Sequence, residues 1–170
     1  MTEYQAALLL AQLTRFERQS RNREENAKQL SLLLREIPGI EPAGMYPGCT
    51  RNTSYVYMAR YDERSFKGLP RAGFLRALNK EGIPCGSGYR PLNREPFMEK
   101  ILSSRHYRRI YSGERLKRYR EQSRCPATDA LSRESLFFSH RLLMGGREDV
   151  MQVAEAVARI QKHAEEIARL

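Results

Sequence analysis

The stretch "TSYVYMARY", residues 53–61, is the clearest strand signal in the 170-residue chain. It is rich in β-branched and aromatic residues, and Tyr55 and Tyr57 alternate onto one face. Core packing explains these two tyrosines at least as well as contact with a ligand does. Because helical patterns flank this strand on both sides, the sequence predicts a mixed class of fold.

Upstream of the strand, the sequence predicts one long helix over residues 2–37. Thr2 and Gln5 form a capping box, and no proline or glycine follows before Pro38. Such a helix would span roughly 54 Å. Residues 6–13 are apolar almost all round, so we expect them to be buried on every side. An apolar stripe returns towards the end of the helix, at Leu30, Leu33, Leu34 and Ile37.

Downstream of the strand, helical and extended segments alternate. The expected order is a helix from Pro70 to Gly82, an extended segment at 83–92, a polar basic loop at 93–124, a short helix at 128–135, a strand at 136–138 and a final helix after Gly146. This order predicts an α+β fold with a small three-stranded sheet covered by helices. We expect one domain over 1–170, with its α+β body at 50–170 and a mobile basic excursion at 94–124.

The segment "GIPCGSGYRPL", residues 82–92, holds the most suggestive loop. Cys85 would need a nearby base to act as a nucleophile, and no histidine stands in a recognisable cysteine-hydrolase context. We therefore interpret it as a small residue at a strand end. The loop is not a phosphate cradle either, because Pro91 holds Arg90 extended where a helix would have to begin. Tyr89 and Arg90 could hold a polar or anionic substrate, or could belong to an ordinary exposed loop.

The net charge of +10 is concentrated in one part of the chain. Arg94 to Arg124 contains ten Lys/Arg residues against four glutamates. Three tyrosines are interleaved with these cations, a pattern found in nucleic-acid binding. A solvated surface explains the pattern better, so we do not expect nucleic acid as a partner.

Several classes of protein do not fit the composition. No apolar run is long enough to span a membrane, and the first residues lack the features of a signal peptide. The three cysteines are odd in number and lack metal-ligand spacing, which favours a reduced, cytoplasmic protein. The histidines lie far apart, and no carboxylate pair joins them, so no metal site is expected.

Four segments, taken in order, resemble the DegT/StrS family of sugar aminotransferases. They are "MTEYQAALLLAQLTRFERQSRNREENAKQLSLLL", "TRNTSYVYMARYD", "GIPCGSGYRPLNREPF" and "CPATDALSRESLFFSHRLLMGGREDVMQVAEAVARIQK". The resemblance covers most of the chain except the middle of 94–124. The "GIPC…GY-x-PL" element is most similar to the branch that acts on inososes and related cyclitol or amino-sugar precursors.

The resemblance implies the small, C-terminal domain of a fold-type-I pyridoxal-phosphate enzyme, with a mainly antiparallel sheet. It implies substrate contacts from Tyr89, Arg90, Asn52 and Tyr55, and no catalytic residue, cofactor ligand or metal ligand in this chain. Many relatives have histidine where Asn52 and Gly88 stand. The lysine that carries the cofactor has no counterpart here, and neither does an Asn-Tyr-Arg segment that reaches the neighbouring subunit's phosphate. We therefore expect pyridoxal phosphate in the complete enzyme, but none bound to this chain alone.

The resemblance also implies partners. The family works as dimers, so we expect the missing large domain or a partner subunit to cover the chain, and self-association through residues 6–16. A competing hypothesis is a non-catalytic basic module that binds a polyanion or a protein through residues 94–124.

Overall fold

A computed structural model describes residues 1–169. The chain divides into two compact units: unit 1 comprises residues 1–87 and 136–170, and unit 2 comprises residues 88–135. Unit 2 contains the predicted basic excursion. The single-domain organisation expected for residues 1–170 stays a prediction.

Unit 1 is built on a small sheet whose strands lie in the order β1-β2-β4-β3. The strands are β1 (Ile40–Pro42), β2 (Val56–Tyr61), β3 (Cys85–Ser87) and β4 (Ser135–Ser139). β1 pairs antiparallel with β2, with Ile40 opposite Tyr61, and β3 pairs antiparallel with β4, with Cys85 opposite Phe138. The sequence predicted three of these strands. The fourth, β1, was missed because it contributes only three residues and ends at a proline.

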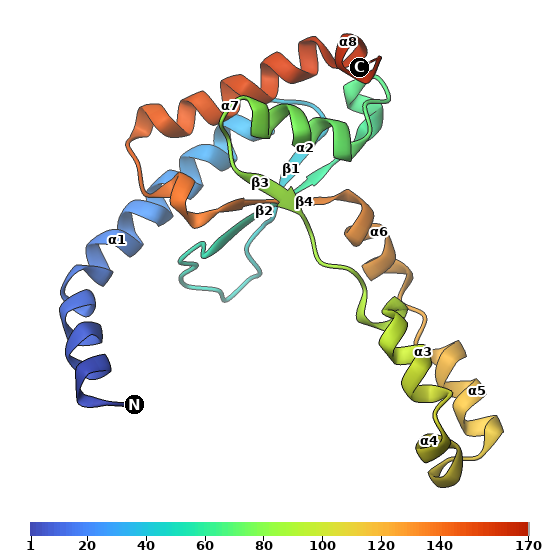
Figure 1. The fold of residues 1–170 in the computed structure, drawn as a ribbon. Helices are drawn as coiled ribbons and strands as arrows, with labels where there is room; N and C mark the ends of the chain where they lie inside the picture. The colour runs from blue at the N-terminus through green and yellow to red at the C-terminus, as the bar shows by residue number, and fades with distance from the viewer. Residues whose placement is uncertain (170) are drawn as a thin grey trace. The chain divides into compact units, whose positions relative to one another are not determined.

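Helices of unit 1 cover the sheet (Figure 1). They are α1 (Glu3–Arg35), α2 (Arg71–Lys80), α7 (Arg147–Lys162) and α8 (Ala164–Ala168), with short 3-10 turns η1 (Glu63–Phe66) and η3 (His140–Leu143). The predicted capping box of Thr2 and Gln5 is present. The α+β prediction is confirmed, with a long N-terminal helix and an antiparallel sheet.

An aromatic cluster occupies the centre of unit 1. Tyr61, Phe66 and Phe74 have ring centroids 4.7–5.1 Å apart, and all three side chains are buried. The Tyr61 hydroxyl donates to the carbonyl of Leu69 at 2.7 Å, which satisfies the one polar atom that this packing buries. Leu30 and Leu34 of α1 are fully buried in the same core. The second half of α1 is therefore fixed to the body of the unit.

The first half of α1 extends beyond the rest of unit 1 (Figure 1). Leu9 is 47% exposed, Leu10 is 66% exposed and Leu13 is 61% exposed. The prediction that residues 6–13 are buried on every side is therefore wrong for the described chain. The apolar pattern was read correctly, but no other element of unit 1 reaches far enough along the helix to cover it.

Unit 2 is helical, whereas the sequence predicted a polar loop over 93–124. Its elements are η2 (Leu92–Arg94), α3 (Pro96–Leu102), α4 (Arg105–Ile110), α5 (Gly113–Gln122) and α6 (Pro126–Glu134). Ser104 and Ser112 cap α4 and α5 by accepting hydrogen bonds from backbone N–H groups. The helices were missed because they are short and bury few side chains, notably Leu102 and Leu116. None of the helices in residues 1–169 combines the length and apolarity that a membrane span requires.

Candidate functional site

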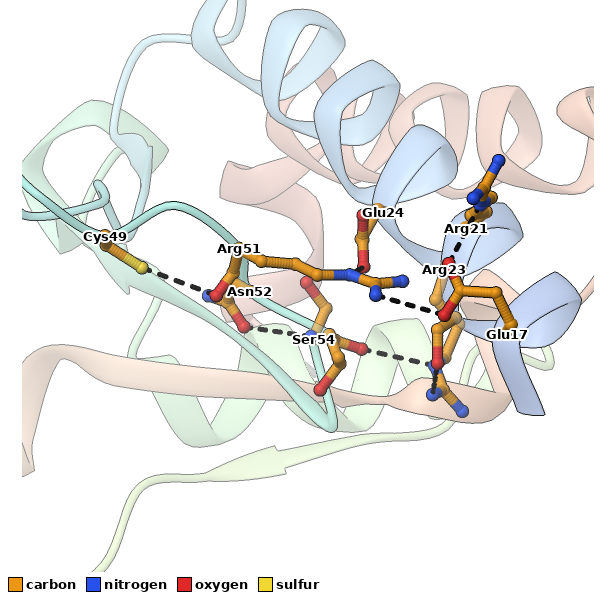
Figure 2. Close-up of polar contacts among 10 residues, drawn as sticks. Glu17, Arg21, Arg23, Glu24, Cys49, Arg51, Asn52 and Ser54 are labelled. Atoms are coloured by element: carbon orange, nitrogen blue, oxygen red, sulfur yellow. Dashed lines mark hydrogen bonds and ion pairs between the residues drawn. The ribbon is translucent and has the colours of Figure 1, made fainter. Parts of the chain in front are cut away.

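A polar section in the middle of α1 holds the loop that precedes β2 (Figure 2). The Arg51 guanidinium reaches from this loop to two carboxylates of α1: it donates to Glu24, and to Glu17 at 3.1 Å. Hydrogen bonds from Arg21 and Arg51 lower the pKa of Glu17, so this carboxylate stays ionised at neutral pH. From α1, Arg23 donates to the Thr53 carbonyl at 3.2 Å. The loop is therefore anchored at both ends of the segment 51–53.

The anchored loop presents Asn52 in a fixed orientation. The side-chain oxygen of Asn52 accepts a hydrogen bond from the Ser54 backbone N–H at 2.9 Å. Ser54 is buried and has a φ of 47°, a left-handed conformation that non-glycine residues rarely adopt. This local turn explains why Asn52 stands where it does, since its side chain stabilises the strained backbone two residues on.

The same section of α1 holds a second loop, between η3 and α7. The side-chain amide of Asn26 donates to the carbonyls of Leu143 and Gly145, both at 3.0 Å. The amide of Asn22 donates to the Met144 carbonyl at 3.1 Å. One polar face of α1 thus fixes the ends of two loops that are about ninety residues apart in the sequence.

Tyr55 directly precedes β2 and His140 directly follows β4, and their side chains meet beside the sheet. Their rings stack with centroids 5.3 Å apart and planes inclined by 15°. Tyr55 is 75% exposed, so its outer face and hydroxyl remain available. Tyr57 is buried, so core packing explains its place on the strand. Tyr55 is largely exposed, so core packing does not explain it and ligand contact stays open.

Tyr89 and Arg90 lie in unit 2, directly after β3. Tyr89 is 85% exposed, and the Arg90 side chain makes a long ion pair with Glu95 at 3.4 Å. Gly88 precedes them, and its backbone N–H donates to the Ser135 carbonyl at 3.2 Å. A Cβ atom at Gly88 would lie 1.9 Å from the Ser135 hydroxyl, so a side chain at this position would require Ser135 to shift.

The four predicted substrate residues therefore fall into two groups. Asn52 and Tyr55 lie together on the anchored loop of unit 1, whereas Tyr89 and Arg90 follow each other in unit 2. Sequence reasoning missed His140, which stacks on Tyr55. It also missed the pairing of Arg51 with Glu17 and Glu24, because contacts between distant segments leave no periodic pattern.

Cys85 has the environment of a structural cysteine. Its thiol is half-buried and donates to the Leu75 carbonyl, and the Asn79 amide donates to its sulfur at 3.3 Å. Burial raises the pKa of the Cys85 thiol to about 11, against a smaller opposite effect of Asn79. Residues 1–169 also contain no group of three or more His, Cys, Asp or Glu side chains that could hold a metal ion.

The sequence matches a known family over most of its length. Residues 1–158 match the DegT/DnrJ/EryC1/StrS aminotransferase family. The chain is 33% identical, over 170 residues, to an L-glutamine:2-deoxy-scyllo-inosose aminotransferase of Streptoalloteichus tenebrarius. That match covers 98% of this chain but only 39% of the relative. A 3-amino-5-hydroxybenzoate synthase of Amycolatopsis mediterranei is 29% identical over 163 residues, covering 93% of this chain and 38% of that protein.

Solved structures show the same relation. A crystal structure of 3-amino-5-hydroxybenzoic acid synthase superposes with a TM-score of 0.70 and 28% identity, covering 97% of this chain and 38% of that one. Helicobacter pylori PseC, an aminotransferase involved in pseudoaminic acid biosynthesis, shares the fold at 17% identity with a TM-score of 0.68, over 95% of this chain and 38% of its own. The chain thus spans about two fifths of the length of these relatives, and it belongs to the DegT/DnrJ/EryC1/StrS aminotransferase family.

Proposed function

We propose that this chain is the small-domain part of a pyridoxal-phosphate-dependent aminotransferase that acts on a cyclitol or sugar ketone. The observation that carries the proposal is the family match over residues 1–158, combined with relatives named for inosose amination. The resemblance supports a position at the C-terminal end of such an enzyme. There it closes the active site of a larger, lysine-bearing domain.

The residues of this chain suit the recognition of a polyhydroxylated ring. A cyclitol presents many hydroxyl groups, which both donate and accept hydrogen bonds. We propose that Asn52 and Tyr55 contribute an amide and a phenol to this recognition, and that Tyr89 and Arg90 contribute a second phenol and a guanidinium. The ring face of Tyr55, held against His140, offers a flat surface for the apolar face of the substrate ring.

The cofactor itself finds no fitting site among the residues described. Its attachment requires a lysine in a shielded pocket, and all six lysines of this chain are exposed. Pyridoxal phosphate would supply the electron sink for amino transfer in the complete enzyme. No step through the cofactor is assigned to this chain, whose residues bind and orient substrate.

A chimeric enzyme tests this proposal. The matching two fifths of the Streptoalloteichus inosose aminotransferase is replaced by this chain, and amino transfer from L-glutamine to 2-deoxy-scyllo-inosose is measured. We expect transfer above that of the relative lacking its own matching part. A folded chimera that binds the cofactor, but is inactive on this inosose and on a panel of related sugar ketones, would refute the proposal.

The competing function, a basic module, has one structural observation in its favour. Five arginines and one lysine of α4 and α5 are exposed without a carboxylate partner among the described residues: Arg105, Arg108, Arg109, Arg115, Lys117 and Arg118. Binding of the chain to single-stranded DNA, with an affinity that falls steeply between 50 and 200 mM salt, would favour that function.

A further inference from the structure

A groove in unit 1 lies between the second half of α1 and the connection from β1 to β2. Its volume is about 480 Å³, within the range of roughly 300–1,000 Å³ that is typical of small-molecule sites. It is lined on one side by α1 and on the other by residues 43–45, 50–52 and the start of β2. Asn52 lines it, but Tyr55 and His140 do not, so the groove adjoins the aromatic pair described above without including it.

The charge in this groove is positive and only partly compensated. Arg51, Lys28 and Arg35 line it, together with a single carboxylate, Glu24. Glu24 is already bound by Arg51. Lys28 and Arg35 are exposed on α1 and have no carboxylate partner within the described residues. They are two helical turns apart, about 10 Å along the axis, so their long side chains can converge on one anionic group.

The hydroxyl groups of Ser31 and Tyr57 on the floor of the groove already have hydrogen-bond partners within the protein. Ser31 donates to the Ala27 carbonyl at 2.8 Å, so the Tyr57 hydroxyl, 2.8 Å from Ser31, must be the donor of the bond between them. Burial raises the pKa of Tyr57 to about 12, so the hydroxyl keeps its proton at neutral pH. Both hydroxyls are thus satisfied internally, and the unmet requirement of the groove is negative charge.

The rest of the lining combines the polar residues Thr50, Asn52 and Ser54 with partly exposed apolar side chains. Leu32 is 65% exposed and Met45 is 53% exposed, and Val56 and Met58 of β2 lie beside them. Methionine is a flexible side chain that adapts to varied ligands. A ligand complementary to this lining would have an apolar body next to an anionic head.

In three other grooves among the described residues, the cationic side chains do not outnumber the carboxylates. The groove of about 410 Å³ beside α7 contains the Arg159–Glu81 ion pair at 2.8 Å. In unit 2, the groove of about 320 Å³ contains the Arg120–Glu99 pair at 2.7 Å. The contrast singles out the groove beside α1.

We propose that the groove lined by Lys28, Arg35, Leu32 and Met45 binds a small organic anion, a carboxylate or phosphate carried on an apolar body. Such a ligand would bridge α1 and the β1–β2 connection. It would thereby hold the loop that carries Asn52 and Tyr55. The proposal does not depend on the aminotransferase function, because binding to the isolated chain requires neither cofactor nor turnover.

Phenyl phosphate is the probe. Inorganic phosphate, which lacks the ring, and benzyl alcohol, which lacks the charge, are the comparison compounds that separate the two contributions to binding. Titration of the isotopically labelled chain should shift the backbone amide signals of residues 28–35 and 43–58. We expect phenyl phosphate to bind more tightly than either comparison compound. The double variant Lys28→Gln/Arg35→Gln should weaken its binding by about tenfold or more, a loss of about 1.4 kcal/mol. Leu32→Ser should bring it towards the affinity of inorganic phosphate.

The matched control removes two positive charges elsewhere in unit 1, at Lys80 and Lys162. Both side chains are exposed and do not line the groove. Lys80→Gln/Lys162→Gln should therefore leave the affinity unchanged. Equal weakening in both double variants, or amide shifts confined to residues 105–118, would overturn the proposal, since either result means that the anion follows net charge alone. Unchanged binding in Lys28→Gln/Arg35→Gln would overturn it as well.

Discussion

Gly88 shows how a single missing side chain shapes the candidate site. A Cβ atom at Gly88 would overlap the Ser135 hydroxyl at 1.9 Å and its Cβ at 3.0 Å. Ser135 is buried and has little freedom to move away. The close packing against Ser135 therefore suits a glycine before Tyr89.

Gly88→Ala should accordingly destabilise the chain by about 1–3 kcal/mol, as is usual for an overpacked site. Urea unfolding measures the change. Gly113→Ala is the matched control, because a Cβ there meets nothing within 4 Å and lies in the first turn of α5, so its effect should be neutral or slightly stabilising. The double variant Gly88→Ala/Ser135→Gly should recover most of the lost stability. If Gly88→Ala is as stable as Gly113→Ala, the close approach is not a constraint.

Cys85 should be the least reactive of the three thiols. With a pKa raised to about 11 by burial, roughly one thiol in a thousand is ionised at pH 8, and the thiolate is the reactive form. Cys49 and Cys125 are exposed. In the variant Cys49→Ser/Cys125→Ser, the remaining thiol should react with Ellman's reagent at least tenfold more slowly in the native state than in urea. Rapid native reaction would reopen the nucleophile hypothesis for Cys85.

At the scale of elements, α1 has apolar residues along one seam in its exposed half and again in its buried half, with the polar Ser20 and Arg23 between them. Leu9, Leu13 and Phe16 are followed by Ser20, Ala27, Leu30 and Leu34 at alternating spacings of three and four residues or their sums. The later members are buried, while Leu9, Leu13 and Phe16 are about half exposed. This spacing is that of a coiled-coil seam, which normally faces another helix.

We therefore expect the isolated chain to self-associate through residues 6–16, as an antiparallel pair of helices. The seam is symmetric about residue 11, so that Leu9 faces Leu13 and Ala6 faces Phe16 of the second copy. Each leucine buried contributes about 1.5–3 kcal/mol. Sedimentation at micromolar concentration should show a mass above the 19.8 kDa of one chain. Leu9→Glu should restore the monomer, whereas Leu32→Glu, which is exposed on the same helix outside the seam, should not. A monomeric parent chain would contradict this pairing.

The helices of unit 2 should be the first part of the chain to be cleaved by trypsin. α3, α4 and α5 have seven, six and ten residues, lengths at which an isolated helix is marginal in water. Their cations repel one another, which weakens the unit further. Early cleavage should map by mass spectrometry within residues 94–124. First cuts in α7, which has exposed arginines but a buried apolar stripe, would show that unit 2 is the more stable part.

The same physical reasons explain which elements the sequence predicted and which elements it missed. The long helix, strand β2 and helix α7 were predictable, because local caps and regular apolar spacing specify them. β1 and the helices of unit 2 were not, since they are too short to show a period. A substrate role for Tyr89, Arg90, Asn52 and Tyr55 stays a prediction, and the stacking of His140 on Tyr55 could be found only from the fold. The exposure of residues 6–13 depends on what lies outside the helix, which no local pattern can specify.

At the scale of the whole molecule, the isolated chain should form no stoichiometric adduct with pyridoxal phosphate and should show no amino transfer. All six lysines are exposed, so water can reverse any imine that forms on them. Absorbance titration, borohydride reduction and peptide mapping provide the measurement. The expected result is sparse labelling spread over several lysines. A single lysine labelled to completion would show that this chain has a cofactor site of its own.

The hydrogen bonds from α1 to the loops at 51–53 and 143–145 determine which way each face of the helix points. Asn22, Arg23 and Asn26 lock the rotation of α1 about its own axis relative to the sheet. Each residue of a helix advances the direction of its side chain by about 100°. One residue inserted between Phe16 and Ser20 would leave the core unchanged, yet turn the seam of residues 6–16 through about 100°. The number of residues between positions 6–16 and Asn22 thus sets the direction in which that apolar face points. A partner that docks there must approach from that direction.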